Sequence, residues 1–144
     1  MSTDGVNRPD RMLRLLLAVI AFGLLFLFGI AIWLEPDPRG FGTHQQLGFP
    51  PCQFRQFLGV HCPHCGMTTS FSNIVRGRFD AAWDANPLGI LLATMFAGAI
   101  PWCLATAVTG RFIGTREPFW WLVLGSIGYL VLAVMVWLLR VFVM

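Results

Sequence analysis

The sequence has few charged residues and no lysine. Charged residues make up 12% of the 144 residues and hydrophobic residues 56%, whereas a soluble domain has roughly a quarter of its residues charged. This balance excludes an ordinary soluble domain and indicates a membrane protein. All basic residues are arginines scattered along the chain, so the net charge of +3 does not form the dense basic patch of a nucleic-acid-binding protein.

Carboxylates are absent from the long apolar segments. Three uncharged runs can cross a bilayer at about 1.5 Å per residue. They are Leu15–Leu34, Pro87–Val108 and Phe119–Leu139. Without an acidic residue in these runs, a proton relay through the membrane is hard to build. The first run is longer than a signal segment of roughly 7–15 residues and lacks a small-x-small cleavage pattern, so we expect a retained anchor.

We therefore predict an all-α membrane protein with three transmembrane helices. A cysteine-bearing loop with a short surface helix is expected between the first and second. As a single domain, the chain divides into a polar N-terminal tail (1–12), transmembrane helix 1 (13–34), the cysteine loop with its surface helix (35–85), transmembrane helix 2 (86–108), a short loop (109–118) and transmembrane helix 3 (119–140).

Several residues mark where the predicted helices begin and end. Tryptophans, which favour headgroup depth, lie near the span boundaries at Trp33, Trp83, Trp120, Trp121 and Trp137. Asn86 is the predicted N-cap of the second span and Pro87 its first helical residue, while Pro101 is expected to bend the helix.

The surface helix is predicted from a stripe of apolar residues at helical spacing. The stripe consists of Met67, Phe71, Ile74 and Val75. It predicts a short helix over Met67–Arg76 that Gly77 ends. We expect this helix to lie along the membrane surface, with Trp83 at headgroup depth.

The arginine distribution predicts the orientation in the membrane. Three arginines precede the first span and Arg39 alone follows it, while Arg111 and Arg116 precede the third span and Arg140 follows it. The middle span favours neither direction, since two arginines flank it on each side, Arg76 and Arg78 before it and Arg111 and Arg116 after it. Because cytoplasmic flanks carry the excess of arginine at the first and third spans, the N-terminus is predicted to be cytoplasmic and the cysteine loop external.

The loop holds a concentration of soft ligands that membrane packing does not require. Cys52, Cys62 and Cys65 lie in it, together with every histidine of the chain, namely His44, His61 and His64. Cys103 lies in the second span, where a small hydrophobic side chain needs no other role. Since an odd number of loop thiols cannot close into disulfides within one chain, either one stays free or the group binds something.

Three interpretations of the cysteines remain open. The Cys62-x-x-Cys65 spacing suits a tetrahedral metal, and the candidate ligands are Cys52, Cys62, Cys65 and His64, with Zn²⁺ as the candidate cofactor. A disulfide that staples the loop and leaves one free thiol is the second interpretation. The third is a redox pair, because Pro63-His64 also separates the cysteines of strongly oxidising thioredoxin-fold enzymes. No strands typical of that fold are predicted here.

Two further expectations concern the cysteine spacing. The nine residues between Cys52 and Cys62 are enough to make a turn and return, so we predict that the three sulfur atoms converge on one point. His61, His64 or water would complete a metal site there. A c-type haem site needs a histidine directly after the second cysteine, and Gly66 stands at that position.

Two sequence elements carry a resemblance to a known family. "C-x9-C-P-x-C-G-M-T" and "G-x-F-x-A-A-W-x-A-N-P-L-G", between Pro51 and Trp102, resemble the bacterial membrane family catalogued as domain of unknown function 2752. The positions carried over are Cys52, Cys62, Pro63, Cys65, Gly66, Thr68, Asn86, Pro87 and Gly89. The family usually has arginine in place of Thr69 and often glycine in place of His64.

The functional expectation is an accessory or scaffold protein of a membrane complex. We expect a multi-pass protein of the bacterial cytoplasmic membrane with a structural or metal-binding three-cysteine site, and no enzymatic activity. The alternative is a membrane thiol–disulfide oxidoreductase or redox partner that uses Cys62 and Cys65. Expected partners are membrane lipid and either another membrane protein or a second copy of the chain, and nucleic acid is not expected.

Overall fold

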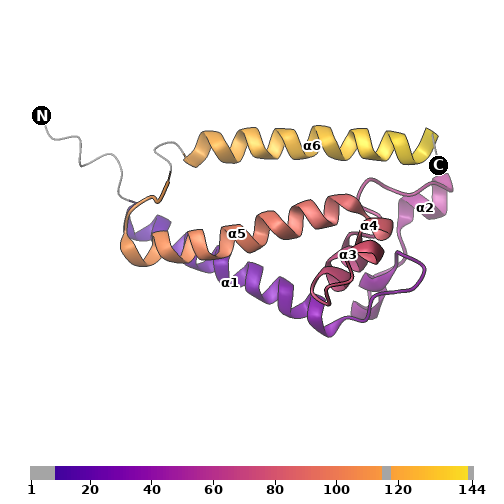
Figure 1. The fold of residues 1–144 in the computed structure, drawn as a ribbon, viewed down its shortest axis with the longest axis horizontal. Coiled ribbons are helices and arrows are strands. Elements are labelled where there is room, and N and C mark those ends of the chain that lie inside the picture. Colours follow the sequence, from indigo (N-terminus) through magenta and orange to yellow (C-terminus); the bar gives the residue numbers. More distant parts are fainter. Residues whose placement is uncertain (1–8, 115–117, 143–144) are drawn as a thin grey trace, which may run out of the picture.

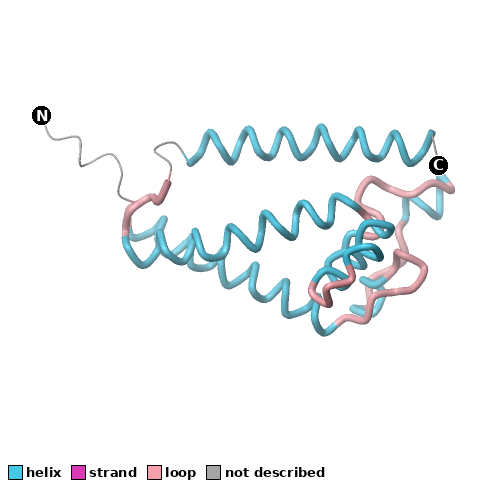
Figure 2. Tube along the Cα trace, in the orientation of Figure 1, coloured by secondary structure: helices cyan, strands magenta, loops and turns pink. Residues whose placement is uncertain are grey.

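All regular structure in the described part of the chain is helical. The computed structural model describes residues 9–114 and 118–142 (Figures 1 and 2). The elements are α1 (Arg11–Trp33), the 3-10 helix η2 (Thr43–Leu47), α2 (Gln53–Leu58), α3 (Met67–Ile74), α4 (Phe79–Ala85), α5 (Pro87–Thr109) and α6 (Pro118–Phe142). Helices α1, α5 and α6 are long and apolar enough to cross a membrane. The predicted class, with the cysteine loop between the first and second spans, is confirmed.

The starts of the first two spans are fixed by side-chain caps. Asp10 accepts a hydrogen bond of 2.8 Å from the N–H of Leu13, so α1 begins within the segment expected to be a polar tail. Residues 1–8 of that tail and 115–117 of the expected short loop lie outside the described residues. Asn86 accepts a 3.0 Å bond from the N–H of Leu88, and Pro87 is the first residue of α5. This cap was predicted and is confirmed.

The spans α1 and α5 pack side by side, and α6 lies along α5 in the view of Figure 1. The α1–α5 contact includes a buried cluster of Leu17, Ala21 and Cys103. Small side chains here allow the two helices to approach closely. Cys103 therefore contributes to packing, as expected. Among the described residues of α6, Ala133 is buried and most other side chains are exposed. The exposed side chains are mainly apolar, so α6 presents a surface suited to lipid.

Helix α3 confirms the predicted short helix, although it ends at Ile74 and not at Arg76, and its apolar stripe faces other helices. The ring of Phe71 is buried, with its centroid 5.9 Å from that of Phe28 on α1 and 6.1 Å from that of Phe96 on α5. The stripe was expected to pack on the membrane surface. It is buried instead because α3 lies across the ends of two spans, which offer a larger apolar contact area than the headgroup layer.

Two arginines satisfy the open ends of spans to which they do not belong. Arg14 of α1 donates a 2.7 Å bond to the carbonyl of Ala107 near the end of α5. Arg76, just after α3, donates to the carbonyls of Ala31 and Ile32 at 3.1 and 2.8 Å, near the end of α1. The last carbonyls of a helix have no partner within it, and leaving them bare near lipid is costly. Both arginines thus have a structural role, and Arg14 also contributes to the arginine bias before the first span.

Candidate metal centre

Two separate turns bring the loop cysteines to one place. Cys52 is the residue immediately before α2, and this short helix ends at Gly59, whose φ of 70° turns the chain back. The chain then reaches a tight turn in which the N–H of Cys65 donates a 3.0 Å bond to the carbonyl of Cys62. A helix between Cys52 and the second turn was not predicted, since the segment was expected to be loop. It supplies the reversal that the convergence of the sulfurs requires.

Gly66 joins the cysteine turn to α3 at a point where no side chain fits. Its φ is 83°, a left-handed conformation that glycine adopts without strain. A Cβ atom added here would lie 2.4 Å from the carbonyl oxygen of Ala85 and 2.7 Å from that of Gly40. The backbone of three chain segments therefore meets around this residue, which explains the need for glycine directly after Cys65.

Asn86 connects the cysteine turn to the second span. Its amide nitrogen donates to the carbonyls of Cys65 at 3.0 Å and Pro63 at 3.2 Å, while its oxygen caps α5 through Leu88. The side chain is fully buried, so each of these bonds satisfies a polar group that has little access to water. One asparagine thereby positions the cysteine turn over the N-terminus of α5.

A second buried contact fastens α3 to the same junction. The hydroxyl of Ser70 donates to the carbonyls of Ala82 and Asn86, at 3.0 and 2.9 Å. Gly89 of α5 leaves the room for it, because a Cβ atom there would lie 2.4 Å from the Ser70 oxygen. The Asn-Pro-Leu-Gly element thus caps α5 and also provides the surface on which α3 packs. The cysteine turn directly precedes α3.

The sulfur atoms of Cys52, Cys62 and Cys65 lie within 4.8 Å of one another. The predicted convergence is confirmed. Three thiolates that share a tetrahedral ion at a Zn–S distance of about 2.3 Å have sulfurs about 3.8 Å apart, so a small contraction of this cluster suffices for a common ion. All three are free thiols, with Cys65 buried and the other two half-buried.

The three thiols have different proton affinities. For Cys52, burial raises the pKa, but the N–H groups of Arg55 and Phe54 at the start of α2 and the neighbouring Cys62 thiol together lower the pKa below its usual value. Burial and the contact with Cys52 raise the pKa of Cys62 to about 11. Burial and the Cys52 charge also raise the pKa of Cys65. Cys52 is therefore the thiol that ionises first.

Two arginines from different parts of the fold place positive charge near the cluster. Arg55 of α2 lies with its guanidinium carbon 3.8 Å from the centre of the Phe41 ring, and Arg140 of α6 donates to the backbone carbonyl of Ala85. Both guanidinium groups favour the ionised form of Cys65, against the effect of burial.

The structure separates the three histidines of the loop. His64, the predicted fourth ligand, lies outside the group of converging ligand atoms, and its Nε2 is 3.4 Å from the hydroxyl of Tyr129 on α6. The ring of His61 packs 5.5 Å from that of Phe41, and burial followed by the charges of two arginines lowers its pKa. His44 lies on η2 and is half-buried.

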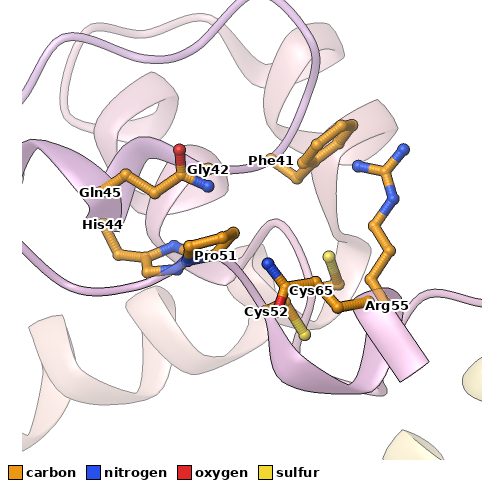
Figure 3. A pocket seen from close by; sticks show the side chains of 9 residues that line it. Phe41, Gly42, His44, Gln45, Pro51, Cys52, Arg55 and Cys65 are labelled. Carbon is orange, nitrogen blue, oxygen red and sulfur yellow. The ribbon is translucent and has the colours of Figure 1, made fainter. Parts of the chain in front are cut away.

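Cavities flank the sulfur cluster. One of about 200 Å³ has Arg55 on one side, His44 on the other and two of the cysteines between them (Figure 3). A second, of about 340 Å³, is lined by all three cysteines together with His44 and His64. Small molecules or an ion can therefore approach the thiols. His44 is the histidine that lines both cavities.

Sequence patterns missed several residues of this centre. Arg55 follows Cys52 by one helical turn, a relation that becomes visible only once α2 is known. Arg140 and Trp137 belong to the third span, and Trp137 donates a 2.8 Å bond to the carbonyl of His61. Their distance from the cysteines along the chain leaves no signal in the sequence.

Comparison with known proteins supports the resemblance noted in the sequence. The searches of curated proteins and of solved structures gave no match. Residues 52–100 match the model of a family described as a protein of unknown function (DUF2752). The matched segment includes the loop cysteines, Asn86 and the first part of α5. The predicted family resemblance is thereby confirmed.

Proposed function

We propose that Cys52, Cys62 and Cys65 bind one Zn²⁺ ion. The observation that carries this proposal is the convergence of three free thiols within 4.8 Å from two turns of the chain. Thiolates are soft ligands that favour Zn²⁺ over hard ions such as Mg²⁺. Three thiolates and one dication have a net charge of −1, which Arg55 and Arg140 offset.

The role of the ion in this proposal is structural. It ties α2 to the turn before α3, and Asn86 in turn ties that turn to the second span. The chain then serves as an accessory or scaffold protein in the bacterial cytoplasmic membrane, with its N-terminus in the cytoplasm and the metal centre external. Its surroundings are membrane lipid and either another membrane protein or a second copy, and no reaction is assigned to it.

The redox alternative has less support from the thiols themselves. A thiol–disulfide exchange enzyme needs a nucleophilic thiolate with a low pKa, usually the first cysteine of the Cys-x-x-Cys pair. Here that cysteine is Cys62, whose pKa is raised to about 11. The favoured thiolate is Cys52, which lies outside the pair.

Metal content and thiol protection test the proposal. We expect the protein, purified in detergent without chelator, to contain one zinc per chain by mass spectrometry of the metal. The three loop thiols should resist alkylation until a chelator is added, because metal-bound thiolates are protected. Cys62→Ser should lose the zinc, whereas Cys103→Ser, which changes a buried packing residue of α5, should retain it.

Two results contradict the proposal. Immediate alkylation of all three loop thiols in metal-replete protein would show that no ion protects them. Alkylation that requires a reductant and not a chelator would reveal a disulfide and favour the redox alternative.

A further inference from the structure

The metal centre proposed above has three sulfur ligands and lacks a fourth. Within the described residues, no histidine or carboxylate joins the three sulfurs within the same 4.8 Å. His61 lines neither of the two cavities described above, and His64 lines only the larger one. His44 lines both of them, and Figure 3 shows it in the smaller one.

A hydrogen bond determines which nitrogen of His44 is free to bind a metal. Nε2 lies 3.3 Å from the carbonyl oxygen of Pro50, an atom that can only accept a hydrogen bond. In a neutral ring that makes this contact, Nε2 carries the proton and Nδ1 keeps its lone pair. Histidine ligands of metals characteristically donate their other N–H to a backbone carbonyl or carboxylate, which fixes the tautomer and the ring orientation.

The position of η2, which carries His44, is set by a buried contact with α3. The hydroxyls of Thr43 and Thr69 lie 2.8 Å apart, and the Thr43 oxygen also accepts a 2.9 Å bond from the N–H of Asp37. Both threonines are buried, so this contact is shielded from water. This contact therefore anchors the segment that carries His44 to the start of α3.

We infer that Nδ1 of His44 is the fourth ligand of the metal centre, which would then have three sulfur ligands and one nitrogen. This inference rests on the proposed zinc site. A neutral imidazole adds no charge to the centre, so the compensation by Arg55 and Arg140 is unchanged. Since His44 lies outside the 4.8 Å group, its ring must move toward the sulfurs when the ion binds.

X-ray absorption of the zinc-loaded wild-type protein tests the inference without a variant. We expect three Zn–S distances of about 2.3 Å and one Zn–N distance of about 2.0 Å, with the outer-shell scattering of one imidazole ring. Histidine variants then identify which ring it is. His44→Ala should remove the imidazole scattering and weaken Co²⁺ or Zn²⁺ binding at least about 10-fold. His64→Ala is the matched control and should leave both the spectrum and the affinity unchanged.

The outcomes separate this inference from the proposed function. The assignment of His44 is overturned if the zinc is bound by three sulfurs and one oxygen. It is also overturned if the imidazole scattering persists in His44→Ala. In both cases the three-cysteine site stands. Loss of the nitrogen ligand in His64→Ala instead assigns the fourth position to His64. A wild-type protein that binds neither Zn²⁺ nor Co²⁺ removes the proposed site and this inference together.

Discussion

Gly66 illustrates how much of the cysteine turn depends on a single residue. It combines a positive φ with the closest backbone approach around the turn, since a Cβ atom would lie 2.4 Å from the oxygen of Ala85. Backbone atoms cannot move aside as a flexible side chain can. Any other residue here must displace either α3 or the end of α4, and with them the sulfur of Cys65.

Replacing Gly66 with alanine should be more damaging than the same change at Gly77. Gly77 also has a positive φ, of 71°, but its added Cβ would meet no atom within 4 Å. Gly77→Ala should therefore cost only the left-handed strain of about 1–2 kcal/mol. Gly66→Ala adds a backbone clash to the same strain. The melting temperature of the Gly66→Ala protein in detergent should therefore fall below that of the Gly77→Ala protein, and metal binding should be lost. Equal losses in the two variants would contradict the role assigned to the close approach.

At the scale of elements, α6 is held mainly to the cysteine loop. Trp137 donates to the carbonyl of His61, Arg140 donates to the carbonyls of Asp84 and Ala85, and Tyr129 contacts His64. By contrast, α1 packs closely with α5. The third span therefore contacts the backbone on both sides of the metal centre, and its docking should depend on how well ordered that loop is.

Removing one of these contacts should loosen the loop without unfolding the spans. Trp137→Phe keeps an aromatic ring against Phe54, 6.1 Å away, but loses the bond to His61. A net hydrogen bond is worth about 1 kcal/mol, which corresponds to roughly fivefold faster amide hydrogen exchange in the loop around Cys62. Trp121→Phe, an exposed position near the other end of α6, is the control. Unchanged exchange in Trp137→Phe would argue against docking through this bond.

At the scale of the whole molecule, the arginine bias predicts that the cysteine loop faces the outside of the cell. The loop lies between the first two of the three helices that are long and apolar enough to cross a membrane. Arg14, which contributes to this bias, also donates a hydrogen bond to a carbonyl near the end of α5. The accessibility of the loop thiols from outside the cell tests this predicted orientation.

A membrane-impermeant thiol reagent applied to intact bacterial cells makes that measurement. After treatment with a chelator and a reductant, we expect labelling of Cys52, Cys62 or Cys65, because the arginine bias predicts an external loop. A variant with all three changed to serine retains only Cys103, buried in α5, and should stay unlabelled. Labelling that appears only after the cells are broken would reverse the orientation.

The sequence alone determined the class of the protein and the starts of two of its helices, α3 and α5. Apolar runs of spanning length can hardly fold otherwise in a membrane, where each backbone group needs an internal partner. The cap at Asn86 and the helix beginning at Met67 were also predictable, because capping and helical spacing depend on neighbouring residues. The convergence of the cysteines followed from the reach of a short connection.

Only the tertiary structure decided what surrounds the cysteines. Three contacts join residues that are distant in the chain. Asn86 donates to the cysteine turn, Arg140 donates to the carbonyl of Ala85, and His64 contacts the hydroxyl of Tyr129. Such contacts depend on how the helices pack, and helical periodicity in one segment carries no information about its neighbour. The apolar stripe of α3 has the same limitation, because its spacing marks a buried face but not whether lipid or protein covers it.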